Sequence, residues 1–175
     1  MKRLFLLRHA KTEPHGPSFQ DRERALLPRG RDDVPVMGRY MKSHGYAPDL
    51  ILCSNARRTV QTLELLEPFL VGEPETDYLG ALYLAEPDNL LAHIAAAPDS
   101  AKGLMLVGHN PGMEQIASDL SAAPVKRKVQ DKMDLMEEKF PTGALAVLDF
   151  NVRHWRDIAL KSGLLADFVR PKDLR

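Results

Sequence analysis

Leu4-Phe5-Leu6-Leu7-Arg8-His9-Ala10-Lys11 is the segment from which the architecture of the chain can be worked out. Four consecutive apolar residues are typical of a strand buried on both faces, as in a parallel sheet. The run ends at Arg8 and His9, and open α/β sheets bind their ligands just beyond the carboxyl ends of the strands. These two side chains are therefore candidates for chemistry. The alternative is that they open a solvated loop.

Two further short apolar segments have the same form. The segment 49–53 leads into Arg58, and the segment 103–108 ends at His109. Amphipathic patterns between these segments predict helices, and irregular polar sequence from Thr12 to Leu27 predicts a loop that borders a site. Helices are expected over Arg31–Ser43, from Val60 to Leu70, from Pro87 to Pro98 and over Gly112–Ser121. Pro35 would lie near the first turn of the first helix, and Ser54 or Asn55 would cap the second. Two more strands, joined as a hairpin, are expected over Ala144–Phe150 and Trp155–Leu160.

Strands that alternate with helices favour a parallel sheet whose carboxyl ends share one edge. Arg8, His9, Arg58 and His109 would then lie close together although they are far apart in the sequence. Such a set suits phosphoryl transfer, because a guanidinium group matches phosphate oxygens and a neutral imidazole can attack phosphorus. The start of the helix after His109 would add backbone N–H groups and a dipole worth about 0.3–1 kcal/mol to an anion.

Length and composition indicate one ordinary globular domain over residues 1–175. Lys+Arg and Asp+Glu both number 24, so no net charge draws the molecule to nucleic acid or to a membrane surface. Cys53 is the only cysteine, which excludes a disulfide framework and favours a reducing compartment. Four apolar residues before Arg8 are too few for a secretory signal. A soluble cytoplasmic protein is expected.

Three motifs now stand at the three strand ends. Leu7-Arg8-His9-Ala10 resembles the Arg-His-Gly signature of the histidine phosphatase superfamily, with Ala10 in place of the usual glycine. The segment 54–62 (Ser-Asn-Ala-Arg-Arg-Thr-Val-Gln-Thr) is similar to the Ser-x-x-x-Arg-x-x-Gln-Thr segment of that superfamily, and its register selects Arg58 rather than Arg57. Gly108-His109-Asn110-Pro111 resembles the segment of the second histidine.

The resemblance extends over most of the chain except Lys126–Lys139. The short length, the segment Asp21–Gly30 and the closing Val169-Arg170-Pro171 look like the small bacterial phosphohistidine phosphatases of the SixA type. This resemblance implies a three-layer α/β/α sandwich with a mostly parallel central sheet, as in phosphoglycerate mutase. It also implies catalysis without a cofactor or a metal ion.

The resemblance further implies a mechanism in two steps. His9 attacks the substrate phosphorus and becomes a phosphohistidine, which water then hydrolyses. Arg8, Arg58 and His109 hold the phosphoryl oxygens and neutralise the charge of the transition state. A cationic pocket would also lower the pKa of His9 and keep it nucleophilic. The expected partner is a phosphohistidine-bearing protein, such as a phosphotransfer domain of a signalling relay, or a small phosphorylated substrate.

The general acid is where the sequence departs from the superfamily. Larger members place a carboxylate about where Leu84 stands here, and Glu86 is the nearest carboxylate. Glu86 is equally well explained as an acid that complements the dipole of the helix begun by Pro87. A labile P–N bond would need only weak acid assistance.

Several other residues fit structural roles better than catalytic ones. Cys53 lacks the arginine six positions later that a cysteine phosphatase needs, and Lys11 suits a solvated loop. Arg24 and Arg29 either guide an anionic substrate or pair with Asp21, Asp32 or Asp33.

Two alternatives to the signalling phosphatase stay open. One is a phosphatase or mutase of small metabolites, for which only the charged surface segment Lys126–Lys139 could supply a lid. The other is a phosphate-binding protein without catalysis, against which the intact set of four site residues argues.

Overall fold

The computed structural model describes residues 1–16 and 20–175 and builds them around a six-stranded sheet. The strand order is β3-β2-β4-β1-β5-β6; β1 to β4 are parallel, and β5 runs antiparallel to both β1 and β6. The prediction of a mostly parallel sheet is therefore confirmed. The strands are β1 (Lys2–Arg8), β2 (Leu50–Ser54), β3 (Glu75–Leu79), β4 (Gly103–Gly108), β5 (Leu145–Phe150) and β6 (Leu164–Val169).

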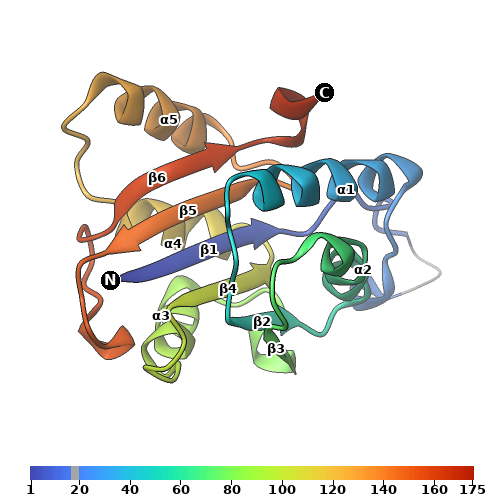
Figure 1. Ribbon diagram of the computed structural model, residues 1–175. Helices are drawn as coiled ribbons and strands as arrows, with labels where there is room; N and C mark the ends of the chain where they lie inside the picture. The colour runs from blue at the N-terminus through green and yellow to red at the C-terminus, as the bar shows by residue number, and fades with distance from the viewer. Residues whose placement is uncertain (17–19) are drawn as a thin grey trace.

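Helices cover both faces of the sheet, which gives the predicted three layers (Figure 1). The helices α1 and α2 pack on one face, and α3, α4 and α5 pack on the other. Among the described residues, no helix is long and apolar enough to cross a bilayer. The helices are α1 (Pro28–Ser43), α2 (Arg57–Leu66), α3 (Pro87–Ala95), α4 (Gly112–Leu120) and α5 (Arg127–Glu138).

The apolar run of β1 supplies both layers of the core. Leu4 and Leu6 point into the core beneath α3, α4 and α5, whereas Phe5 and Leu7 point into the core beneath α1 and α2. None of the four is more than 2% exposed. Burying a side chain of this size stabilises the fold by about 1.5–3 kcal/mol, so β1 is held firmly at the centre of the sheet.

The predicted strand Trp155–Leu160 is wrong, because the last strand is β6. Trp155 lies in a 3₁₀ turn over Trp155–Asp157, is fully buried, and donates its indole N–H to the carbonyl of Ala101 over 2.8 Å. Trp155 is therefore apolar because it is buried at the end of the sheet, and not because it belongs to a strand with alternating apolar residues. The sequence patterns also missed β3, an edge strand without a fully buried residue.

Two helix details also differ from expectation. Helix α1 begins three residues earlier than predicted, with Pro28 in its first turn, so Pro35 lies in the interior of the helix. Neither Ser54 nor Asn55 caps α2, whose N-cap residue is Ala56. The loop expected over 12–27 contains a 3₁₀ turn at Asp21–Glu23, and its residues 17–19 lie outside the described part of the chain.

The charged segment 126–139 is helical and packs beside the sheet edge. Met133 and Met136 of α5 are buried in the core, and α5 lies against β6. The segment is thus part of the outer layer over β6 and does not reach over the carboxyl edge of the parallel strands (Figure 1).

Asp167 joins the two outer layers at the β6 edge. Asp167 is 3% exposed. Its carboxylate accepts hydrogen bonds from Tyr40 of α1 (2.6 Å), from Tyr46 (2.9 Å) and from Lys132 of α5. Burial alone would raise the pKa of Asp167, but the hydrogen bonds from Lys132 and the two tyrosines hold it below its ordinary value.

We expect Asp167→Asn to lower the free energy of unfolding by about 3 kcal/mol at pH 7, because Lys132 loses a partly buried partner. A carboxyl group with a lowered folded-state pKa stabilises the fold above its unfolded pKa of about 4 and loses this effect as the pH falls through the folded value. The difference between variant and wild type should therefore shrink on acidification in urea titrations. Asp149→Asn, which breaks the more exposed pair with Arg3, is the control and should cost no more than about 1 kcal/mol. Equal costs for both variants would contradict this role of Asp167.

Candidate active site

Three parallel strands deliver their ends to one edge of the sheet. Strand β4 lies between β2 and β1, with Arg8 paired to Gly108, and the backbone N–H of His9 donates to the carbonyl of Gly108 over 3.1 Å. His9 and His109 therefore leave adjacent strands side by side, with ring centroids 5.4 Å apart. The structure thus brings the two predicted histidines together.

His9 is set up as a neutral nucleophile. It is 4% exposed, and its Nδ1 lies 2.8 Å from the carbonyl oxygen of Ala10, so Nδ1 carries the proton and Nε2 keeps a free lone pair. Burial lowers the pKa of His9 well below its ordinary value; the nearby charges of His109, Arg8 and Arg58 act in the same direction. The cations expected from the sequence to cause this shift contribute less than burial does.

His109 presents a hydrogen-bond donor toward the same place. Its Nε2 lies 2.7 Å from Oγ of Ser54, which also accepts a hydrogen bond from the N–H of Ala56. We assign the Ser54 hydroxyl as the donor to Nε2, which places the proton of His109 on Nδ1. Burial and the charge of Arg58 lower the pKa of His109 to about 3, so the ring is neutral near pH 7. Ser54 serves His109 instead of capping α2.

Arg58 is the buried arginine of the pair at the start of α2. Arg58 is 1% exposed and Arg57 is exposed, so the arginine that the motif register selects is the buried one. The two terminal nitrogens of Arg58 donate to the backbone carbonyl (2.8 Å) and the carboxylate (3.0 Å) of Asp21. Arg8 uses one terminal nitrogen on the carbonyl of Phe140 over 3.0 Å.

Unpartnered donors mark the space between these side chains. Buried polar atoms in proteins are nearly always hydrogen-bonded, so each exception needs an explanation. Among the described residues, Arg8 Nε, Arg58 Nε and His109 Nδ1 are buried without a partner, and so is Arg24 Nε, which lies 2.9 Å from the Asp21 carboxylate. Three hydrogen-bond donors on the predicted site residues thus have no acceptor among the described residues. A tetrahedral oxyanion such as phosphate supplies that kind of acceptor.

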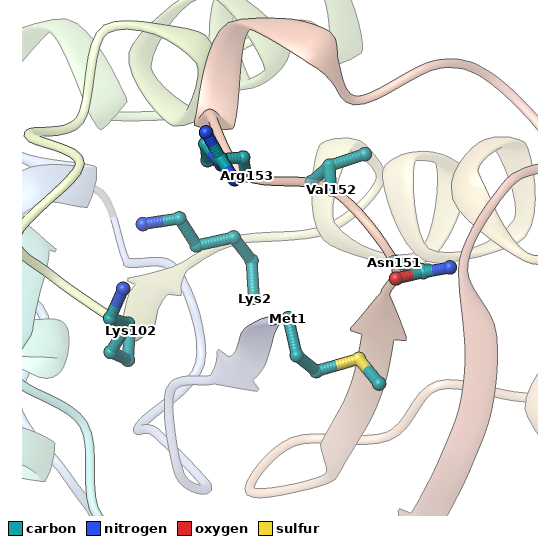
Figure 2. Close-up of a pocket in the computed structure, with 6 residues that line it drawn as sticks. All are labelled: Met1, Lys2, Lys102, Asn151, Val152 and Arg153. Atoms are coloured by element: carbon teal, nitrogen blue, oxygen red, sulfur yellow. The ribbon is translucent and has the colours of Figure 1, made fainter.

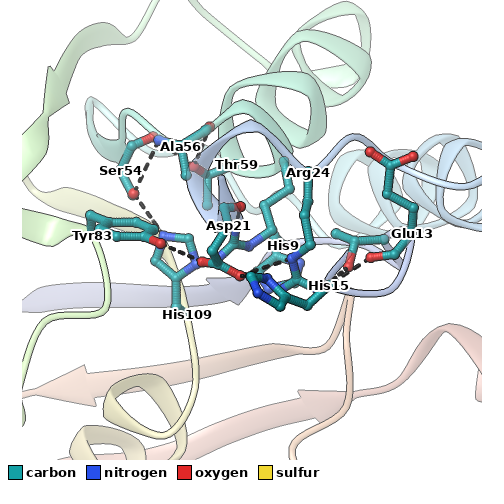
Figure 3. Close-up of polar contacts among 12 residues, drawn as sticks. His9, Glu13, His15, Asp21, Arg24, Ser54, Ala56, Thr59, Tyr83 and His109 are labelled. Atoms are coloured by element: carbon teal, nitrogen blue, oxygen red, sulfur yellow. Dashed lines mark hydrogen bonds and ion pairs between the residues drawn. The ribbon is translucent and has the colours of Figure 1, made fainter. Parts of the chain in front are cut away.

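Asp21 belongs to the site, although the sequence suggested it only as an ion-pair partner of Arg24 or Arg29. Its carboxylate accepts a hydrogen bond from Arg58. It also accepts a hydrogen bond from the Tyr83 hydroxyl and forms an ion pair with Arg24 over 2.9 Å (Figure 3). The Tyr83 ring stands edge-on to the His109 ring, with centroids 5.4 Å apart. Burial would raise the pKa of Asp21, but Tyr83, Arg58 and Arg24 lower it to about 2. The segment Asp21–Gly30, already noted for its resemblance, was the available signal.

The remaining predicted residues lie outside this cluster. Glu86 is exposed, precedes α3 as its N-cap residue, and takes part in no side-chain hydrogen bond or ion pair among the described residues. Lys11 is exposed, as expected for a loop lysine. Cys53 is fully buried, and burial raises the pKa of its thiol to about 12.

The start of α4 is less free to bind an anion than expected. The backbone N–H of Met113 donates to the carbonyl of His109 over 2.9 Å, and that of Glu114 donates to the side-chain oxygen of Asn110 over 3.2 Å. The helix still directs its dipole toward His109, but these two donors are already used.

A further hollow lies at the opposite edge of the sheet. Met1, Lys2, Lys102 and Arg153 are among the residues that line it (Figure 2). The Lys2 ammonium group donates to the carbonyls of Asp99 (2.5 Å) and Ala101 (2.9 Å). Lys2 therefore ties the chain together rather than offering a free cation. Among the described residues, no group of three or more His, Cys, Asp or Glu side chains is arranged to hold a metal ion.

Comparisons with known proteins point to one superfamily, although no protein-family model matches the chain. A solved structure from Agrobacterium tumefaciens, provisionally assigned as the phosphohistidine phosphatase SixA, is 31% identical, with a TM-score of 0.75 over 97% of this chain and 98% of that one. Another with the same provisional assignment, from Nakamurella multipartitia, is 28% identical, with a TM-score of 0.82 over 97% and 96%. An uncharacterized protein of Mycobacterium tuberculosis is 32% identical over 167 residues, which are 95% of this chain and 100% of the relative.

Proposed function

Because the chain belongs to the histidine phosphatase superfamily and is a phosphatase, we propose that it removes the phosphoryl group from a phosphohistidine in a protein. One observation carries the proposal. A buried, neutral His9 with a free Nε2 lone pair lies beside Arg8, Arg58 and His109, which carry three buried donors without partners.

Each site residue has a part in the proposed reaction. His9 Nε2 attacks phosphorus, while Arg8 Nε, Arg58 Nε and His109 Nδ1 donate to the phosphoryl oxygens and stabilise the charge of the transition state. Water then hydrolyses the phosphohistidine. The two guanidinium groups offset the charge that a magnesium ion offsets in other phosphoryl-transfer enzymes, so the proposed mechanism uses no metal.

A cationic cleft beside the site supports a protein substrate. Its volume is about 260 Å³, and Lys11 in its lining follows His9 by two residues. The N–H of Gly143, next to the cleft wall, donates to the carbonyls of Arg8 (3.2 Å) and His9 (2.9 Å). An acidic protein surface would complement the charge of this lining. Of the charged residues in this lining, Arg29 and Arg175 form ion pairs with Asp33, and Arg170 forms one with Asp173. Lys11 and Lys172 form no ion pair among the described residues.

The packing of α5 favours the same substrate over a small metabolite. A mutase must enclose its phosphorylated intermediate, and 126–139 was the segment of the chain proposed for a lid. This segment lies against β6 and buries Met133 and Met136 in the core. We further propose that the protein works in a signalling relay in the cytoplasm, where a reducing environment suits the buried free thiol of Cys53.

A substrate panel tests this proposal. We expect kcat/KM for a phosphohistidine protein to exceed that for free phosphohistidine and for sugar or glycerate phosphates by at least about tenfold, because the cleft adds contacts with the protein. Lys172→Glu places a negative charge on the exposed side of the cleft and should raise KM for the protein alone. Lys161→Glu, an exposed lysine outside the cleft, is the control. A preference for a small phosphate ester would overturn the proposed substrate.

A further inference from the structure

We propose that Asp21 is the general acid of the first step and the general base of the second. This inference rests on the proposed phosphatase chemistry of His9 but not on the identity of the physiological substrate. The sequence offered Glu86 for this role, but Glu86 is exposed and forms no side-chain hydrogen bond or ion pair among the described residues. The contacts of Asp21 place it in the cluster instead.

The different exposures of His9 and Asp21 place Asp21 on the side from which the leaving group departs. His9 is 4% exposed and Arg58 1%, whereas 28% of the Asp21 side chain is exposed. The nucleophile is therefore the more deeply buried group, and Asp21 lies nearer to the solvent. In an in-line displacement the leaving group departs on the side opposite to the nucleophile. A leaving nitrogen or oxygen thus moves toward the solvent and toward the Asp21 carboxyl group.

Substrate binding changes the charge around Asp21 in the direction that an acid needs. In the substrate-free pocket Arg58, Arg24 and Tyr83 stabilise the carboxylate, and His15 lies 3.9 Å away. A phosphoryl group bound by Arg58 shares that positive charge and adds negative charge beside the carboxylate. Like charge nearby raises the pKa of a carboxyl group, so Asp21 takes up a proton as the substrate binds.

Bonds, electron pairs and protons are all accounted for in the two steps. In the first, the Nε2 lone pair of His9 forms the N–P bond, the bond from phosphorus to the leaving atom breaks, and its electron pair accepts the proton of Asp21. In the second, water attacks phosphorus while the Asp21 carboxylate accepts a water proton, and the N–P electron pair returns to His9. Inorganic phosphate and the protonated form of Asp21 result.

Other acidic groups near the site fit this role less well. Glu114 is exposed and accepts a hydrogen bond from Asn110 over 3.0 Å, so it belongs to the start of α4. The Tyr83 hydroxyl is already committed as a donor to Asp21, and burial raises the pKa of Tyr83. Tyr83 is therefore a positioning residue that holds the carboxylate.

A leaving-group series tests the assignment. A general acid matters most when the leaving group is a strong base. We expect Asp21→Asn to lower kcat for phenyl phosphate at least about a hundredfold, but for p-nitrophenyl phosphate less than about tenfold. Glu23→Gln, an exposed acid in the same 3₁₀ turn, is the matched control and should change neither rate. Equal losses of Asp21→Asn on both esters, or no loss on either, would overturn the proposal.

Two further measurements separate acid catalysis from the positioning of Arg58. If Asp21 only held Arg58, Asp21→Asn would weaken inhibition by inorganic phosphate; as an acid, its replacement leaves that inhibition unchanged or stronger. Tyr83→Phe removes a hydrogen bond that favours the carboxylate, so the alkaline limb of the kcat profile should move to higher pH. A fixed limb would count against the acid. These aryl phosphates need no protein partner, so failure of the phosphohistidine substrate would leave the Asp21 result standing.

Discussion

Replacing His9 by alanine is expected to abolish turnover on every phosphorylated substrate, with a loss in kcat of at least about a thousandfold. The reason is that the other neutral imidazole of the site, His109, uses its unprotonated nitrogen to accept the hydrogen bond from Ser54. The pocket would keep its donors, because Arg8 Nε, Arg58 Nε and His109 Nδ1 come from other side chains. Inhibition by inorganic phosphate should therefore survive in the variant while turnover is lost.

Rapid-quench labelling provides a second readout for His9. The wild-type protein should hold an acid-labile phosphoryl label during turnover, and His9→Ala should hold none. His93→Ala, a substitution of a partly exposed histidine on α3, is the control for the loss of an imidazole and should retain both label and rate. Turnover or labelling that persists in His9→Ala would refute the proposed nucleophile.

Arg58→Ala is expected to lower kcat/KM by about a hundredfold to a thousandfold, the usual cost of losing one charge-stabilising donor. Arg58→Lys should recover little of this, because a lysine cannot hold Asp21 and a phosphoryl oxygen with one planar fork. Inhibition by inorganic phosphate should weaken in parallel, which distinguishes this loss from that of His9→Ala. Urea titrations of each variant would show whether the fold is kept.

Arg57 provides the matched control for Arg58. The two arginines are adjacent in α2, but Arg57 is exposed and Arg58 is 1% exposed. Arg57→Ala should therefore leave kcat/KM within about twofold of the wild type. The reverse ranking of the two variants would show that the motif register, and with it the pocket described above, is wrong.

The central part of the fold was predictable because its strands are buried on both faces. The segments that form β1, β2 and β4 are continuous apolar runs, and the amphipathic helices between them left a parallel sheet as the natural arrangement. The strands at the edges of the sheet have weaker hydrophobic patterns in the sequence. Strand β3 has no fully buried residue, and Trp155 and Ile158 mimic a strand although they plug the end of the sheet.

The site was predictable to the extent that its residues stand at strand ends in recognisable motifs. His9, Arg58 and His109 meet in the structure as the parallel topology requires, although their catalytic roles stay a prediction. Asp21 comes from a connecting segment, and no periodicity fixes where such a segment folds. Protonation states could not be predicted from the sequence either. The tautomer of His109 depends on its contact with Ser54, which lies 55 residues away in the sequence.

The position of β4 has a consequence for how the chain folds. Strand β4 is the fourth strand in the sequence but lies between β1 and β2, and it pairs with β1 across a separation of 100 residues, as in Arg3 with Gly103. Contacts this far apart in sequence form late, because closing a long loop costs entropy before pairing repays it. The nucleophile and the phosphate arginine are both synthesised earlier, yet they become neighbours only when β4 inserts. A nascent or partly unfolded chain therefore carries no assembled pocket, and catalytic competence arises together with completion of the sheet.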